Sequence, residues 1–309
     1  MLLGCSERLA LPPEPETEGG PTGEIAYVVQ YRWSEVPRFG DMVLTSGILY
    51  VIEDSARVHA YYSNKATPAT NTFSFPDPIV VDGTTLGRPV QVAAGAAKTL
   101  WVAFEVPDRR LVQFRIESPP QPTGLWVRDS ASRRFGGIAA DADSGFVYVA
   151  DAELNTIVKY EPSTTGGKRV AVLASEGNGD HFVREPRGLY CYGDSLLVAD
   201  SGKSWLQVLA ADVPYSGRGQ VQGPTGEPLV LHTPVDVWVD ADGRYYVAEQ
   251  GRVLQIRPEG TIKEVVTDHD ELAATLPVAV VANTTQVWVA DPLGQRCTIY
   301  QINTVGEVP

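Results

Sequence analysis

Apolar and polar residues alternate in short runs along the whole chain, a pattern typical of β-strands with two unlike faces. The clearest run is FVYVAD at residues 146–151, and similar runs occur at 48–53, 99–104, 195–200, 244–249 and 286–291. All six runs share one valine, and successive copies are 51, 47, 49, 49 and 42 residues apart: Val51, Val102, Val149, Val198, Val247 and Val289. This near-even spacing predicts a repeat protein.

Four strands are predicted in most repeats, and the valine-containing run is the second of them. A short apolar strand precedes it, usually starting at proline or glycine, at 40–43, 89–92, 136–139, 186–189, 234–237 and 277–280. A third strand follows at 57–61, 111–114, 156–160, 206–209, 253–256 and 298–302. A fourth is predicted in five repeats, at 72–75, 125–127, 170–173, 229–231 and 262–266. Turns rich in Gly, Asp and Asn between the first two strands favour tight hairpins.

One further strand, at 27–31, belongs to no repeat, and the last repeat lacks a fourth strand. If the strand at 27–31 pairs with 298–302, the two chain ends close a ring that leaves only short sheet edges. We therefore predict an all-β fold, a six-bladed β-propeller of four-stranded antiparallel blades, closed by the N-terminal strand joining the last blade. One short surface helix is expected at 268–274.

The chain opens with Leu2-Leu3-Gly4-Cys5, which resembles the lipobox that ends a bacterial lipoprotein signal. Only Met1 precedes it, whereas a signal has a charged segment and an apolar core. Three explanations of this short segment are open: the true start lies upstream, the chain was trimmed, or the match arises by chance. Residues 6–24 are rich in Pro, Glu, Gly and Thr, the composition of a flexible tether. We expect residues 1–24 to be this start and linker, 25–309 to be one propeller domain, and lipid on Cys5 to hold the protein in the periplasm or at the cell surface.

The 309 residues carry a formal net charge of −13, which argues against a nucleic-acid partner because such binding needs clustered Lys and Arg. No uninterrupted run of eighteen apolar residues occurs, so the lipid anchor is the only membrane attachment expected. The three cysteines, Cys5, Cys191 and Cys297, show no metal-binding spacing. Since Cys191 and Cys297 lie in different repeats, we expect separate thiols rather than a disulfide. We also expect a monomer.

The third repeat carries a family resemblance, through Gly136-Gly137-Ile138, Tyr148-Val149-Ala150-Asp151, Asn155 and Ile157-Val158-Lys159-Tyr160. These segments resemble an NHL-type propeller repeat, and Arg187-Gly188-Leu189 with Leu197-Val198-Ala199-Asp200 is the second-best match. The resemblance covers nearly all of residues 25–303 and implies the propeller architecture. It does not imply one activity, since propellers of this kind serve as binding platforms, lyases, lactonases and redox-partner domains.

The gluconolactonase and senescence-marker class is similar in general design, and this resemblance implies a divalent cation such as Ca²⁺ on the propeller axis. Its typical Pro-Asn-Gly corresponds to Pro186-Arg187-Gly188, so an arginine stands where an amide ligand is expected. Its typical Asp-Gly becomes Val235-Asp236. Because a hard cation needs several converging oxygen donors, we expect no cofactor, and the axial cation is the alternative.

Acidic residues stand two positions after the shared valine in five repeats, and Phe104 replaces them in the second. We expect these acids to accept backbone hydrogen bonds in the following loop, and cation binding is the alternative. They are Glu53, Asp151, Asp200, Glu249 and Asp291. The aromatic residues of the same strands are expected to pack between blades: Tyr50, Trp101, Tyr148, Tyr246 and Trp288.

Residues that differ between repeats are better candidates for a ligand site. In the usual strand order of a propeller, the residues that begin each first strand lie on one face together with the loops that follow the valine-containing strands. The predicted ligand-binding residues at this mouth of the channel are Arg38, Asp41, Arg88, Gln91, Arg134, Arg187 and Asp236. The four arginines would suit a carboxylate or a phosphate. The alternative is that each arginine pairs with an acid such as Asp151 or Asp200.

Two functional hypotheses from different classes follow. The first is a non-catalytic extracytoplasmic binding or scaffolding propeller that takes a protein or a small anionic ligand at the channel mouth. The second is a propeller hydrolase or lyase, lactonase-like or lyase-like, acting on a small molecule at the same face through acid-base chemistry by His181, His232, Asp236 and Glu249. No nucleophile elbow, phosphate-binding loop, dinucleotide fingerprint or haem-attachment motif occurs.

Overall fold

The computed structural model describes residues 25–34, 39–53, 57–62, 79–105, 109–117, 119–222, 226, 229–257, 262–265, 277–291 and 296–304. Within these residues every regular element is a β-strand, and no helix is long and apolar enough to span a bilayer. The helix predicted at 268–274, the strand predicted at 72–75, and residues 1–24 lie outside the described residues.

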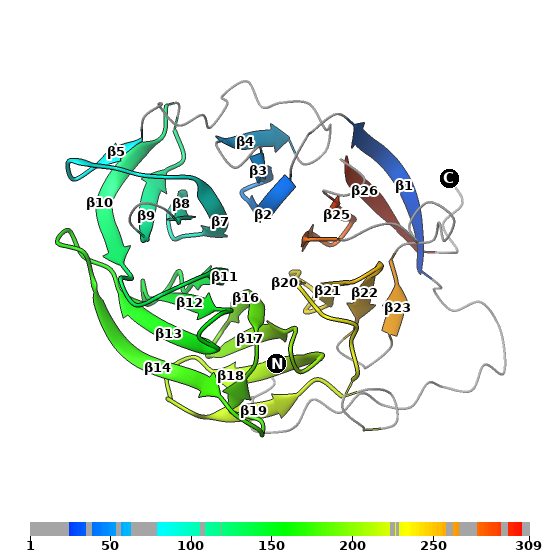
Figure 1. Ribbon diagram of the computed structural model, residues 1–309. Helices are drawn as coiled ribbons and strands as arrows, with labels where there is room; N and C mark the ends of the chain where they lie inside the picture. Colours follow the sequence, from blue (N-terminus) through cyan, green and yellow to red (C-terminus); the bar gives the residue numbers. More distant parts are fainter. Residues whose placement is uncertain are drawn as a thin grey trace, which may run out of the picture.

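The described strands form one small hairpin and six larger sheets that stand around a central axis (Figure 1). The first two sheets and the hairpin contain β2 (Phe39–Thr45), β3 (Ile48–Glu53), β4 (Arg57–Tyr62), the hairpin β5 (Val80–Val81) and β6 (Thr84–Thr85), β7 (Pro89–Ala94), β8 (Thr99–Phe104), β9 (Arg110–Arg115) and β10 (Gln121–Arg128). The third sheet contains β11 (Phe135–Ala140), β12 (Val147–Asp151), β13 (Thr156–Glu161), β14 (Lys168–Glu176) and β15 (Phe182–Val183).

The remaining three sheets complete the ring. The fourth contains β16 (Pro186–Tyr192), β17 (Ser195–Asp200), β18 (Trp205–Ala210) and β19 (Gly217–Gln220), and the fifth β20 (Asp236–Val239), β21 (Tyr245–Glu249), β22 (Arg252–Ile256) and β23 (Ile262–Glu264). The sixth contains β24 (Ala279–Ala282), β25 (Gln286–Asp291), β26 (Arg296–Thr304) and β1 (Ile25–Ser34). Strand pairs are antiparallel except β14 with β15.

The predicted closure of the chain ends is confirmed. Strand β1 pairs with β26, with Tyr27 opposite Ile302 and Val29 opposite Tyr300, and the two strands lie side by side in Figure 1. The N-terminal strand therefore completes the sheet formed by the last repeat and covers its outer edge.

Hydrophobic clusters lie between neighbouring sheets all the way around the ring. Each cluster combines residues of two successive sheets, and one of them joins Met42 and Leu49 of the first sheet to Trp288 and Ile299 of the last. The aromatic residues predicted to pack between sheets all lie in these clusters: Tyr50, Trp101, Tyr148, Tyr246 and Trp288. Burial of this kind supplies the main favourable term in folding.

The strand assignment differs from the prediction in three places, one of which is the hairpin of β5 and β6, where no strand was predicted. The outer strand of the fourth sheet is β19, whereas no strand forms at the predicted 229–231, where Val230 is exposed. The segment GRGQ of β19 was missed because glycine disfavours strands. Gly217 is needed there, since a Cβ would lie 2.3 Å from the carbonyl oxygen of Asp180. Strand β15 is an additional edge strand that the sequence pattern did not predict.

Glycines allow the inner strands β11, β16 and β20 to approach one another closely. A Cβ on Gly137 would lie 2.1 Å from the Arg187 carbonyl oxygen, and one on Gly188 would lie 2.5 Å from the Asp236 Cα. Because backbone atoms occupy this space, they cannot rotate away as a side chain would.

Gly188→Ala should therefore lower the unfolding free energy by about 2–3 kcal/mol, the usual cost of overpacking. The matched control is Gly193→Ala. Gly193 has φ +57° and open space around it, so its substitution should cost only about 1 kcal/mol. Urea unfolding measures the free energy of unfolding of both variants. Equal stability of Gly188→Ala and the wild type would show that β16 and β20 can move apart at little cost.

Candidate functional site

The inner strands all begin on the same face of the ring, which we call the mouth face. Phe39 lies opposite Glu53, Phe135 opposite Asp151 and Pro186 opposite Asp200. The first residues of the inner strands therefore share this face with the ends of the valine-containing strands, as predicted.

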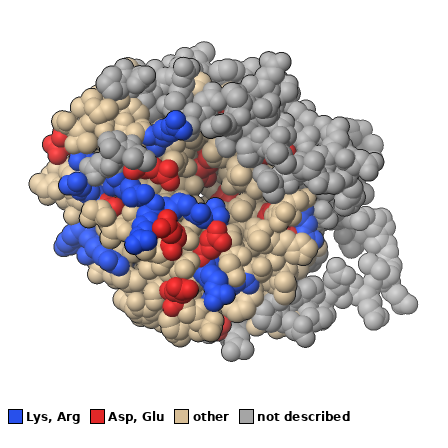
Figure 2. Space-filling model, in the orientation of Figure 1, with Lys and Arg blue, Asp and Glu red and all other residues tan. Residues whose placement is uncertain are grey.

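Basic side chains gather on the mouth face around the centre of the ring, with acidic side chains between them (Figure 2). Arg134 Nη2 lies 3.0 Å from Glu185 Oε1, and Arg187 Nη2 binds the same oxygen. The side chains of Arg134, Glu185 and Arg187 are 43%, 42% and 36% exposed. Two guanidinium groups thus hold one carboxylate, so the cluster keeps one net positive charge at the protein surface.

Glu185 is the acid that sequence reasoning missed. Burial acts to raise the pKa of Glu185, but hydrogen bonds and charge from Arg187 and Arg134 outweigh it and lower the pKa. The two arginines pair with Glu185 rather than with Asp151 or Asp200. Arg88 is exposed on the same face, and Arg38 lies outside the described residues.

The acids at the ends of the valine-containing strands bind the backbone of adjacent loops. Asp151 accepts hydrogen bonds from the N–H groups of Arg133, Glu153 and Leu154 and from the Ser132 hydroxyl. Burial acts to raise the pKa of Asp151, but these hydrogen bonds hold the pKa below its ordinary value. The carboxylate is therefore an acceptor that fixes the loop, which is the role predicted for it.

Asp200 and Glu249 have the same kind of role. The Arg184 N–H donates to Asp200, and the His232 N–H donates to Glu249, which also pairs with Arg252. Within the part of the chain that the structure describes, no three His, Cys, Asp or Glu residues gather in a way that would hold a metal ion. Arg187 stands at the position where the resemblance implies an amide ligand.

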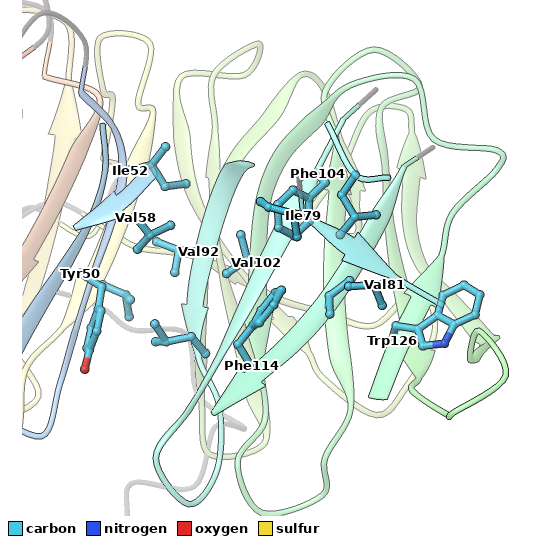
Figure 3. Packing of buried hydrophobic residues seen from close by; sticks show 14 of the residues in the cluster. Tyr50, Ile52, Val58, Ile79, Val81, Val92, Val102, Phe104, Phe114 and Trp126 are labelled. Atoms are coloured by element: carbon cyan, nitrogen blue, oxygen red, sulfur yellow. The ribbon is translucent and has the colours of Figure 1, made fainter. Parts of the chain in front are cut away.

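Phe104 replaces the acid in the second sheet because a hydrophobic cluster covers its position (Figure 3). Phe104 is fully buried in the cluster between the first two sheets, close to Ile79, and its ring lies 6.2 Å from that of Phe114. Ile79 and Val81, at the hairpin β5–β6, complete the cluster. The exception in the repeat thus marks the place where a hairpin, rather than a polar loop, covers the sheet.

The central channel contains a cavity of about 330 Å³ lined by inner strands. Asp41, Gln91 and Asp236 line it, and its wall continues to Asp143 and Gly193 at the far end of the inner strands. The arginines of the mouth face do not line it. The structure therefore separates the described ligand-binding candidates into arginines on the mouth face and a polar group of Asp41, Gln91 and Asp236 inside the channel.

The two channel carboxyls each connect an inner strand to the next one. Asp41 accepts the N–H groups of Met42 and Val92 at 2.8 and 2.9 Å. Asp236 accepts those of Val237 and Val280, both at 2.8 Å. Their residual exposure is toward the cavity, and protein atoms surround both carboxyl groups. Burial therefore raises the pKa of Asp41 to about 7 and, together with the charge of Asp41, raises that of Asp236 well above its ordinary value.

Of the four residues proposed for catalysis, Glu249 and His232 meet through the His232 backbone rather than through its imidazole. The ring of His181 lies 4.3 Å from that of Phe182, and the His232 side chain is exposed. Glu249 accepts a hydrogen bond from the backbone N–H of His232, while Asp236 lies in the channel. Among the described residues the histidine that does face a carboxylate is His59, whose Nε2 lies 3.7 Å from Glu53. Tyr61 also donates to Glu53, so this carboxylate is already engaged in holding β3 to β4.

The predicted separation of the thiols is confirmed for the described residues. Cys191 and Cys297 are both free cysteines. Cys297 is buried between the first and last sheets, with its Sγ 4.0 Å from the sulfur of Met42. Cys191 lines the channel cavity, and burial raises its pKa to about 12, so its thiol is protonated at neutral pH.

The raised pKa of Asp41 predicts a pH-dependent contribution to stability. Between about pH 4 and 7 the folded protein keeps a proton on Asp41 that the unfolded chain has released. The contribution of Asp41 to the free energy of unfolding therefore falls as pH rises, by at most about 1.4 kcal/mol per pH unit. Above pH 7 this contribution is lost. In Asp41→Asn this slope should be reduced. Urea unfolding at pH 5, 6 and 7 measures it, with the exposed Asp143→Asn as control. An unchanged slope in Asp41→Asn would contradict the assignment.

Comparisons with known proteins place the fold and leave the function open. No model of a known protein family matches the chain, and no curated protein matches its sequence. Similar solved structures include a nidogen/laminin complex (TM-score 0.58, 16% identity, 79% of this chain and 84% of that chain covered). They also include a catalytically inactive virginiamycin B lyase from Staphylococcus aureus with quinupristin (TM-score 0.55, 9% identity, 91% of this chain and 100% of that chain covered). A third is a putative glucose dehydrogenase from Thermus thermophilus (TM-score 0.56, 15% identity, 91% of this chain and 100% of that chain covered). All are β-propellers, and the chain has the β-propeller fold.

Proposed function

We propose that this chain is a non-catalytic binding propeller that holds a small anionic ligand or a partner protein at the mouth of its central channel. We further propose that it is of the NHL type, with six blades of four strands in which β15 is an addition, that it requires no cofactor and that it acts as a monomer. The observation that carries the functional proposal is the pair Arg134 and Arg187, which binds a carboxylate at the exposed centre of the mouth face. Guanidinium groups are well suited to this acceptor.

The second candidate, a hydrolase or lyase, has less support. The neighbours include a propeller in a protein complex and a lyase crystallised with quinupristin, so the fold suits either function. That lyase is inactive when a histidine is replaced by alanine. In this chain His181 and His232 face no carboxylate among the described residues, and Glu249 is already paired with Arg252.

Binding at the mouth face can be tested with citrate as an anionic probe. Isothermal titration at low salt should show binding by the wild type, and the double variant Arg134→Ala/Arg187→Ala should bind at least about tenfold more weakly, because charge-assisted hydrogen bonds are lost. The matched control Arg115→Ala/Arg169→Ala removes two exposed charges elsewhere and should bind as the wild type does. Lactone and ester substrates should not be turned over with or without Ca²⁺. Metal-dependent turnover that needs His181 and His232 would refute the proposal.

We also propose that lipid on Cys5 tethers the domain outside the cytoplasmic membrane through the linker to residue 24. The motivation is the lipobox-like start followed by a Pro- and Glu-rich segment. When the gene is expressed in bacteria from its full upstream reading frame, labelled palmitate should enter the protein and be absent from Cys5→Ala. A stop codon directly upstream of Met1, or equal labelling of Cys5→Ala, would refute the anchor.

A further inference from the structure

Arg134 and Arg187 come from different sheets and converge on a single oxygen of Glu185. Arg134 immediately precedes β11, whereas Arg187 lies in β16. Both guanidinium groups donate through Nη2 to Glu185 Oε1. The Nε of Arg187 is buried and has no hydrogen-bond partner among the described residues. The cluster thus has a donor left over, and a carboxylate that presented both oxygens to Arg187 could use it.

Glu185 breaks a positional rule on the mouth face. The inner-strand residues Asp41, Gln91, Gly137, Gly188 and Asp236 occupy corresponding positions, and the residues three places before them are Arg38, Arg88, Arg134, Glu185 and Thr233. Three successive repeats thus have arginine where the fourth has glutamate. The acid stands at the position where the next arginine would be, and it neutralises part of the group.

The backbone of Glu185 is fixed, whereas its side chain is accessible. Glu185 has φ +52°, a conformation that costs free energy for a residue with a side chain. Its N–H donates to Asn155 Oδ1 at 2.6 Å, which ties it to the preceding sheet. The side chain is nevertheless 42% exposed. Rotation of the side chain can therefore release both arginines without disturbing the loop.

We propose that Glu185 occupies a carboxylate-binding site formed by Arg134 and Arg187, and that the carboxylate of a ligand displaces it. This inference rests on the proposed binding function and defines the ligand as one that bears a carboxylate. Two carboxylates cannot share these donors at full strength, because like charges at this distance repel. Glu185 is then an internal competitor that sets the affinity of the site and rejects ligands without a negative charge.

The test compares two charge-removing substitutions on the mouth face. Glu185→Gln keeps the size of the side chain but removes its charge, and it should tighten citrate binding at least about fivefold, as expected when a charged competitor is neutralised. The control Glu153→Gln removes the same charge from the exposed pair with Arg133, 3.4 Å away, and should change binding less than about twofold. The neutral analogue trimethyl citrate should bind neither variant.

Different outcomes separate this inference from the proposed function. If the wild type binds citrate through the arginines but Glu185→Gln binds equally or less tightly, Glu185 is purely structural and the inference is wrong. If neither protein binds citrate, the proposed anion binding at the mouth face is wrong, and the inference about Glu185 is wrong with it. Thermal unfolding checks that Glu185→Gln is folded. If Glu185→Gln does not fold, Glu185→Asp takes its place, because it keeps the charge but draws the carboxylate back from the arginines. Glu185→Asp should then bind citrate more tightly than the wild type.

Discussion

The free edges of the inner strands are the constraint on which the centre of this molecule depends. Each inner strand pairs with a neighbour on one side only, so its other edge presents backbone N–H groups toward the axis. Buried N–H groups without partners destabilise a fold. Asp41 and Asp236 satisfy Val92 and Val280 across sheet boundaries. The carboxyls in the channel therefore serve the assembly of the ring, and their raised pKa values follow from that burial.

The same constraint moves the accessible chemistry to the rim. Around the third and fourth sheets the inner strands pack so closely that a Cβ at Gly136, Gly137 or Gly188 would clash with backbone atoms of the next inner strand. Polar side chains on this side of the ring must then come from residues near the start of each strand. Arg134 and Arg187 are such residues, and for this reason they lie on the mouth face while the acidic residues line the cavity.

Much of the fold could be predicted because strand periodicity reports burial directly. The shared valines and the aromatic residues between sheets follow from which face of a strand is apolar. The pairing of β1 with β26 follows from counting, because one strand belonged to no repeat and the last repeat lacked one. The strand β19 could not be predicted, since Gly217 is required by contact with Asp180 and not by strand propensity. Packing between segments distant in sequence is not encoded in local pattern.

The candidate site was predicted in part, for a related reason. The sequence identified Arg134 and Arg187 as residues that vary between repeats, and it assigned the repeated acid Asp151 to its loop. It also grouped Asp41, Gln91 and Asp236 with the arginines, although these residues lie deeper in the channel. Glu185 was missed because its partners come from two sheets. Aligning the repeats three positions before the channel residue would have exposed it as the acid in a series of arginines.

The charge balance explains why such a site contains its own acid. In a chain of net charge −13, two guanidinium groups on adjacent strands repel each other unless an anion lies between them. Glu185 supplies that anion when no ligand is present. A ligand carboxylate that replaces Glu185 keeps one negative charge between the two arginines, so the exchange leaves the charge of the cluster unchanged. An uncharged ligand that displaced Glu185 would leave the two guanidinium groups without an anion between them, so the pair of arginines favours ligands that bear a carboxylate.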